Sequence, residues 1–194
     1  NNYVYGFMFG MKCESTATAG PSGTEVRASK RVTFENNRLE EIGDPTVFIV
    51  PGPSGGDTFG IKANGKDCLV IGNTVKPRTV NVTTGGLALG IVVVNTHNED
   101  SHVLVEGNTV YGCQYGILQG DTTSTTRECS VDIRSNRLQD ASIYGILAQA
   151  NCTVDSNRIF RAGYSAITVQ IPVENTFVRN NIAIARRLLP RGVR

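Results

Sequence analysis

Short segments in which apolar and polar residues alternate recur along most of the chain, and few segments keep the spacing of an amphipathic helix. Such alternation places every second side chain on one face of a strand. The chain contains 21 Val and 14 Ile against 10 Leu, and β-branched residues favour strands. The pattern therefore predicts an all-β protein.

Six of these segments share one register around an asparagine. Three residues before it stands Phe, Val or Ile, and two residues after it stands Leu, Val or Ile. The six asparagines are Asn37, Asn73, Asn108, Asn136, Asn157 and Asn180. Asparagine tolerates left-handed backbone geometry, and its side-chain amides can bond to one another in stacked strands. The register therefore predicts a solenoid with an asparagine ladder at one corner.

A second repeated piece, in which one residue precedes Gly-Ile or Ala-Ile, lies between the asparagines. Its copies begin at Phe59, Leu89, Tyr115, Tyr144 and Ser165. With repeats of the form G-I-x-x…I-x-x-N-x-I, the chain resembles the right-handed parallel β-helix proteins of the pectin-lyase-like superfamily. The resemblance covers about residues 3–185. It implies a right-handed parallel β-helix of about six coils, each with three strands and three turns.

The repeats also predict where the coils carry insertions. We place the Gly-Ile strand first in each coil, the strand before the asparagine second and the short strand after it third. The turn at the asparagine is then tight in every coil. The first turn is long at residues 13–30, 95–102 and 120–130, and the third turn is long at residues 41–58 and 77–88.

The 194 residues are expected to form one β-helix domain, residues 1–194. The chain opens with an apolar strand and no cap, so we expect it to be part of a longer protein. Residues 186–194, with four arginines, would be a C-terminal cap or a basic tail. The longest nearly apolar run, Leu87–Val94, is too short to span a bilayer, and no signal peptide is recognisable.

Charge and cysteine content narrow the classes further. A formal net charge of +2 is not typical of a nucleic-acid-binding protein, which usually concentrates basic residues on one face. The five cysteines include no CxxC pair, and two interpretations stay open: buried reduced thiols, or one disulfide with thiols left over. His97 and His102 lie too far from any cysteine in sequence for a zinc site.

Candidate chemistry is concentrated in the loops, because the predicted outward face of the first strands carries Lys62 but no carboxylate. The first-turn loops 95–102 and 120–130 belong to adjacent coils and should lie side by side. The candidate catalytic residues in them are His97, Glu99, Asp100, Asp121, Arg127 and Glu128. They offer an acid/base pair, a titratable imidazole and a cation for an anionic sugar, and their oxygens could hold Ca²⁺. Ordinary solvated loops have the same composition.

Two smaller groups of charged residues are also noted. Asp57, Lys62, Lys66 and Asp67 gather around the second coil, where a solvated surface is the alternative. The arginines that follow ladder asparagines are expected to alternate with acidic residues as structural cross-strand pairs. The arginines are Arg38, Arg137 and Arg158, and the acids are Glu35, Glu106 and Asp155.

The resemblance implies two classes of function. The first is a polysaccharide- or oligosaccharide-interacting domain, extracellular or virion-associated, that cleaves glycosidic bonds as a lyase or hydrolase. The second is a non-catalytic structural or adhesive β-helix, such as a tailspike shaft or a surface repeat protein. In the second, Val92, Leu118 and Leu147 would form an exposed association face, for instance in a homotrimer. Neither class includes a nucleic-acid partner or a membrane span.

Overall fold

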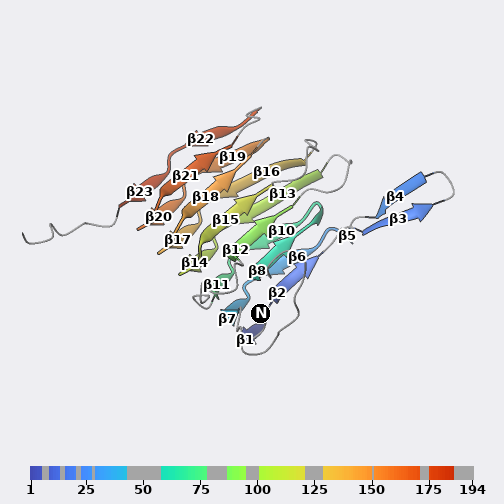
Figure 1. The fold of residues 1–194 in the computed structure, drawn as a ribbon, viewed down its shortest axis with the longest axis horizontal. Helices are drawn as coiled ribbons and strands as arrows, with labels where there is room; N and C mark the ends of the chain where they lie inside the picture. The colour runs from blue at the N-terminus through green and yellow to red at the C-terminus, as the bar shows by residue number, and fades with distance from the viewer. Residues whose placement is uncertain are drawn as a thin grey trace, which may run out of the picture.

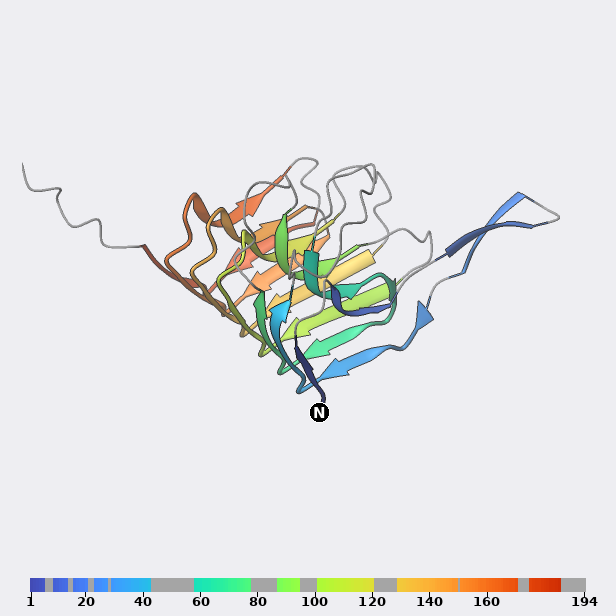
Figure 2. The ribbon, with the colours of Figure 1, turned by 60° about the horizontal axis from the view of Figure 1, so that its bottom comes forward.

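The computed structural model describes residues 1–5, 9–13, 16–20, 23–27, 29–42, 58–77, 87–94, 101–120, 129–149, 151–170 and 175–185. Within them the chain winds into a parallel β-helix. Its strands form three parallel sheets that run along one axis, coil after coil from the N-terminus to the C-terminus (Figures 1 and 2). The predicted all-β solenoid is confirmed.

Each sheet collects one strand from each successive coil. Sheet 1 contains β2 (Phe9–Cys13), β8 (Thr58–Ala63), β12 (Ala88–Val93), β15 (Tyr115–Gln119), β18 (Tyr144–Ala148) and β21 (Ser165–Val169). Sheet 2 contains β6 (Thr33–Glu35), β10 (Leu69–Ile71), β13 (Ser101–Glu106), β16 (Cys129–Arg134), β19 (Cys152–Asp155) and β22 (Phe177–Arg179). Sheet 3 contains β1 (Tyr3–Tyr5), β7 (Arg38–Ile42), β11 (Thr74–Pro77), β14 (Thr109–Tyr111), β17 (Arg137–Gln139), β20 (Arg158–Phe160) and β23 (Ile182–Ile184).

Four further short strands lie in first turns, the connections that lead from sheet 1 to sheet 2. β3 (Thr16–Gly20) and β4 (Gly23–Arg27) pair antiparallel as a hairpin that extends away from the stack (Figures 1 and 2). β5 (Ser29–Lys30) and β9 (Gly65–Lys66) pair in parallel. The long first turn that the sequence predicts at residues 13–30 is therefore an inserted hairpin. In the described part of the chain, no helix has the length and apolar character needed to cross a membrane.

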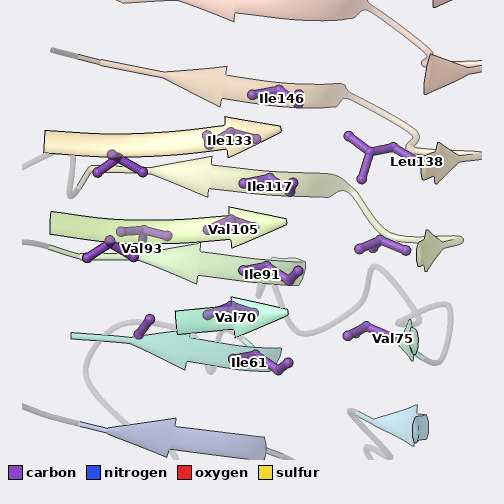
Figure 3. Close-up of a cluster of buried hydrophobic side chains, with 14 of the residues drawn as sticks. Ile61, Val70, Val75, Ile91, Val93, Val105, Ile117, Ile133, Leu138 and Ile146 are labelled. Atoms are coloured by element: carbon purple, nitrogen blue, oxygen red, sulfur yellow. The ribbon is translucent and has the colours of Figure 1, made fainter. Parts of the chain in front are cut away.

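The core consists of rows of identical or similar side chains. Ile61, Ile91, Ile117 and Ile146 are register partners in sheet 1 and are fully buried (Figure 3). Similar rows of valine, isoleucine and leucine from sheets 2 and 3 face them across the interior. Burying each such side chain contributes about 1.5–3 kcal/mol. No coil can complete these rows alone, so the coils stabilise one another by stacking.

The asparagine ladder occupies the corner between sheets 2 and 3. Its members are Asn2, Asn37, Asn73, Asn108, Asn136, Asn157 and Asn181. From Asn2 to Asn157, each backbone N–H and each Nδ2 donates to Oδ1 of the next asparagine; for Asn73 the donor–acceptor distances are 2.8 and 3.0 Å. Nδ2 also donates to a carbonyl of the preceding coil, as Asn108 does to Val70 O at 2.8 Å. The predicted asparagine ladder at one corner is therefore confirmed.

Three details of that prediction need correction. The sixth predicted member, Asn180, is wrong by one residue, since Val154 pairs with Val178 and places Asn181 in the ladder. Asn2 is a further member that the repeat alignment omits. From Asn37 to Asn181, the left-handed backbone belongs to the residue before the ladder asparagine, for example Gly107 (φ 65°) and Asn180 (φ 55°). The ladder asparagine itself is held by its side-chain bonds.

Candidate functional site

All six predicted catalytic residues lie outside the described residues: His97, Glu99, Asp100, Asp121, Arg127 and Glu128. The strands that follow their loops are described. β13 begins at Ser101 and β16 begins at Cys129, and these two residues are register partners in sheet 2. The two candidate loops therefore lead into neighbouring strands. Within the described ranges, no group of three or more His, Cys, Asp or Glu is arranged to hold a metal ion.

A small polar cluster surrounds His102, which the sequence places at the end of a loop and the structure places in β13. Its Nδ1 lies 3.0 Å from Ser130 Oγ, and its Nε2 lies 3.7 Å from Asp132 Oδ2. Its backbone N–H donates to Asp67 Oδ1 at 3.2 Å. The cluster is partly exposed on sheet 2, where the imidazole lies beside one hydroxyl and one carboxylate.

The described members of the group predicted around the second coil lie on different elements. Asp57 lies outside the described residues. Lys62 lies on sheet 1 with its Nζ 5.8 Å from the centre of the Phe59 ring, whereas Asp67 contacts His102. Lys66 pairs through its backbone with Lys30 between β9 and β5.

A row of tyrosines crosses sheet 1 where its strands begin. Tyr115 and Tyr144 are the first residues of β15 and β18 and are register partners. Their ring centres are 5.3 Å apart, and the ring of Tyr164, just before β21, is 5.6 Å from that of Tyr144. Both contacts are edge-to-face, which is a favourable aromatic geometry. We call Tyr115, Tyr144 and Tyr164 the tyrosine row.

Hydrogen bonds between the turns of neighbouring coils fix the spacing of the tyrosine row. The Tyr144 N–H donates to Gln114 O at 3.1 Å, and the Tyr164 N–H donates to Ile143 O at 2.9 Å. In the same two turns, Arg161 Nη2 donates to Asp140 Oδ2 at 2.6 Å, and this bonding raises the pKa of the guanidinium. The turns of neighbouring coils are thus held together by backbone and side-chain contacts. Tyr164 nevertheless keeps 81% of its surface exposed.

The apolar row predicted as an association face is aligned but not exposed. Val92, Leu118 and Leu147 are register partners in sheet 1. Val92 is only 5% exposed and Leu147 only 2%, and Leu118 is half-buried. Val92 belongs to a second apolar cluster with Leu89. The prediction of an exposed patch at these residues is therefore wrong.

The predicted cross-strand pairs between arginines and acids are also wrong. The arginines after the ladder lie on sheet 3, whereas Glu35, Glu106 and Asp155 lie on sheet 2. Arg38 instead pairs within its own strand, with Nη2 2.8 Å from Glu40 Oε1. Arg137 lies over the Phe160 ring, and its register partner is Arg158. The acids pair with arginines of sheet 2, namely Glu106 with Arg134 and Asp155 with Arg179.

The tyrosine row carries a signal that the sequence analysis did not use. Tyr115 and Tyr144 each stand directly before the glycine of a repeated Gly-Ile piece. That fixed offset puts them in one register, and residues in one register of a stacked sheet lie side by side. The position before the glycine, not the position after the isoleucine, therefore predicts the row.

Comparison with known proteins identifies the fold. A family model described as a right handed beta helix region matches residues 11–183. No curated protein and no solved structure matches the chain.

Proposed function

The chain belongs to the right-handed β-helix family, and from this premise we propose that it binds a polysaccharide along the tyrosine row. The fold supplies a long regular surface but does not itself name a ligand. The observation that carries the proposal is the spacing of Tyr115, Tyr144 and Tyr164, with ring centres 5.3 and 5.6 Å apart along the stack.

The chemistry of the row suits a chain of sugar rings. The apolar C–H face of a sugar packs on an aromatic ring, while phenolic hydroxyls bond to sugar hydroxyls. The row repeats with the coils, whose strands are about 4.8 Å apart, so a polysaccharide lying along the stack would meet more than one tyrosine. The Asp140–Arg161 ion pair and the exposed Ser142 lie in the neighbouring turns and supply hydrogen-bonding groups.

Cleavage of the bound chain is the finer proposal, and it rests on the loop residues. Lyase or hydrolase chemistry would use carboxylates among Glu99, Asp100, Asp121 and Glu128, assisted by His97 and Arg127. A hydrolase needs two carboxyl groups about 5–10 Å apart. Both loops lead into adjacent strands of sheet 2, and this supports their proximity.

Binding is tested with a panel of neutral and acidic polysaccharides, by affinity electrophoresis and titration calorimetry, with and without Ca²⁺. We expect Tyr164→Ala and Tyr144→Ala to weaken binding at least tenfold, because each removes a stacking surface. Tyr5→Ala is the matched control, since Tyr5 is an exposed tyrosine on sheet 3. The proposal would be refuted if the folded protein retained no polysaccharide, or if Tyr164→Ala bound polysaccharide as tightly as the unmutated protein.

Cleavage is tested on the polysaccharides that bind. New reducing ends with ultraviolet absorbance of unsaturated sugars would indicate a lyase, and reducing ends alone would indicate a hydrolase. Loss of either signal in Glu99→Gln, Asp100→Asn, Asp121→Asn or Glu128→Gln would assign the acid. Binding without any product would reject the catalytic proposal and leave a binding module.

A further inference from the structure

Two buried thiols from different coils face each other near the beginning of the stack. Cys13 ends β2, and Cys68 immediately precedes β10. Their sulfur atoms are 3.5 Å apart although 55 residues separate them in sequence. Cys13 is 8% exposed and Cys68 is fully buried. The sulfurs need to approach by only about 1.5 Å to reach the length of a disulfide bond.

We propose that Cys13 and Cys68 are an oxidisable pair whose disulfide fastens the first strand of sheet 1 to the second coil. Among the described residues, β2 is an edge strand of that sheet, and β8 is its partner there. An edge strand with one neighbour opens more readily than a strand between two. A covalent bond from Cys13 to the residue before β10 would tie this edge to a strand that has neighbours on both sides.

The oxidant that we propose is a small-molecule disulfide such as glutathione disulfide. The thiolate of one cysteine attacks a sulfur of glutathione disulfide, forms a mixed disulfide and releases one glutathione. The thiolate of the second cysteine then attacks the protein sulfur of the mixed disulfide and releases the second glutathione. Two electrons pass from the cysteine pair to glutathione disulfide, and the two thiol protons end on the two glutathione molecules.

The pair is tested on the whole chain incubated with either glutathione disulfide or dithiothreitol. The samples are then denatured, alkylated, digested with trypsin without reduction and analysed by mass spectrometry. The sequence releases Cys13 in peptide 13–27 and Cys68 in peptide 67–78. The expected product of oxidation is one species that joins these two peptides, with a mass two hydrogens below their sum. It should be absent after dithiothreitol.

The variants Cys13→Ala and Cys68→Ala should lose the joined species, whereas Cys113→Ala should retain it. Oxidised protein should also melt at a higher temperature than reduced protein, and this difference should vanish in Cys13→Ala. Because the peptide map is read on the unmutated chain, a variant that fails to fold does not decide the result. Alkylation of both cysteines after oxidation, or joining of other peptides, would overturn the proposal, as would a mixed glutathione disulfide that never resolves.

Discussion

The Nδ2 atom of Asn108 donates to Oδ1 of Asn136 at 3.0 Å, although the two residues are 28 positions apart and both are buried. The same Nδ2 donates to Val70 O in the preceding coil. Oδ1 of Asn108 in turn accepts from the backbone N–H and the side chain of Asn73. One amide thus binds three coils together, and its buried polar atoms all have partners.

Replacing Asn108 with alanine should destabilise the protein by about 3 kcal/mol or more. The substitution leaves the Asn73 N–H without its acceptor and removes the side-chain bonds to the Val70 carbonyl and to Asn136 Oδ1. An unsatisfied buried group costs about 1–3 kcal/mol, and each lost hydrogen bond adds to this. Urea unfolding followed by circular dichroism gives the difference. The control is Asn36→Gly, which changes an exposed, left-handed asparagine next to the ladder. Equal effects of both substitutions would argue against the ladder as a source of stability.

Replacing Gly116 with alanine should cost about 1–3 kcal/mol through overpacking. A Cβ at this position would lie 2.5 Å from the backbone carbonyl oxygen of Gly145 in the next coil. Gly112→Asn is the matched control, because a Cβ there meets nothing within 4 Å and asparagine tolerates φ of 60°. Thermal melting of the two variants should separate them clearly, and a stable Gly116→Ala would show that the coils can move apart.

Asp155 should make stability depend on acid pH. Hydrogen bonds from Ser156, then Asn180 and Arg179, lower the pKa of its carboxyl group. Its contribution is present above the ordinary aspartate pKa of about 3.9 and is lost as the pH falls through the lowered value. Asp155→Asn should therefore melt below the wild-type protein at neutral pH, and the two should converge as the pH falls through the lowered pKa of Asp155. A gap that stays constant across this range would contradict the assignment.

Cys113 should resist alkylation in the native protein. Burial raises the pKa of its thiol to about 12, so at pH 8 only ~1 in 10,000 molecules carries the reactive thiolate. Iodoacetamide should modify this residue only after denaturation, as a peptide map would show. Rapid native-state modification of Cys113 would mean that the corner near Gly112 opens far more often than its packing suggests.

The sequence predicted the fold because its signal was repeated. Asn37, Asn73, Asn108, Asn136 and Asn157 share fixed apolar neighbours, and five agreeing copies define a register. The last copy was ambiguous, since Asn180 and Asn181 are adjacent and Phe177 with Ile182 fits the pattern for Asn180. Strand pairing places Asn181 in the ladder, because Val178 is the register partner of Val154. Asn2 has no residue three positions before it in this chain to reveal its register.

Side-chain partners were less predictable than strands. Arg137 and Glu106 looked like members of one charged row, but the corner turns them onto different sheets. Periodicity gives the face of a strand and says little about which sheet a neighbouring strand joins after a corner. Alternation places Val92 on the outward face of its strand and therefore predicts that it is exposed. Alternation alone does not reveal that Val92 packs into a second apolar cluster.

Because the corner at the asparagine ladder is the same in successive coils, evolution can gain or lose one whole coil at a time. Every coil presents the same donors to the next asparagine and the same acceptor to the previous one. A coil that is duplicated or deleted as a whole would therefore meet neighbours with which it is already compatible. The hairpin β3–β4 shows that a coil also accepts extra residues at another corner. Tandem duplication and loop insertion can thus change the length and the decoration of this molecule independently.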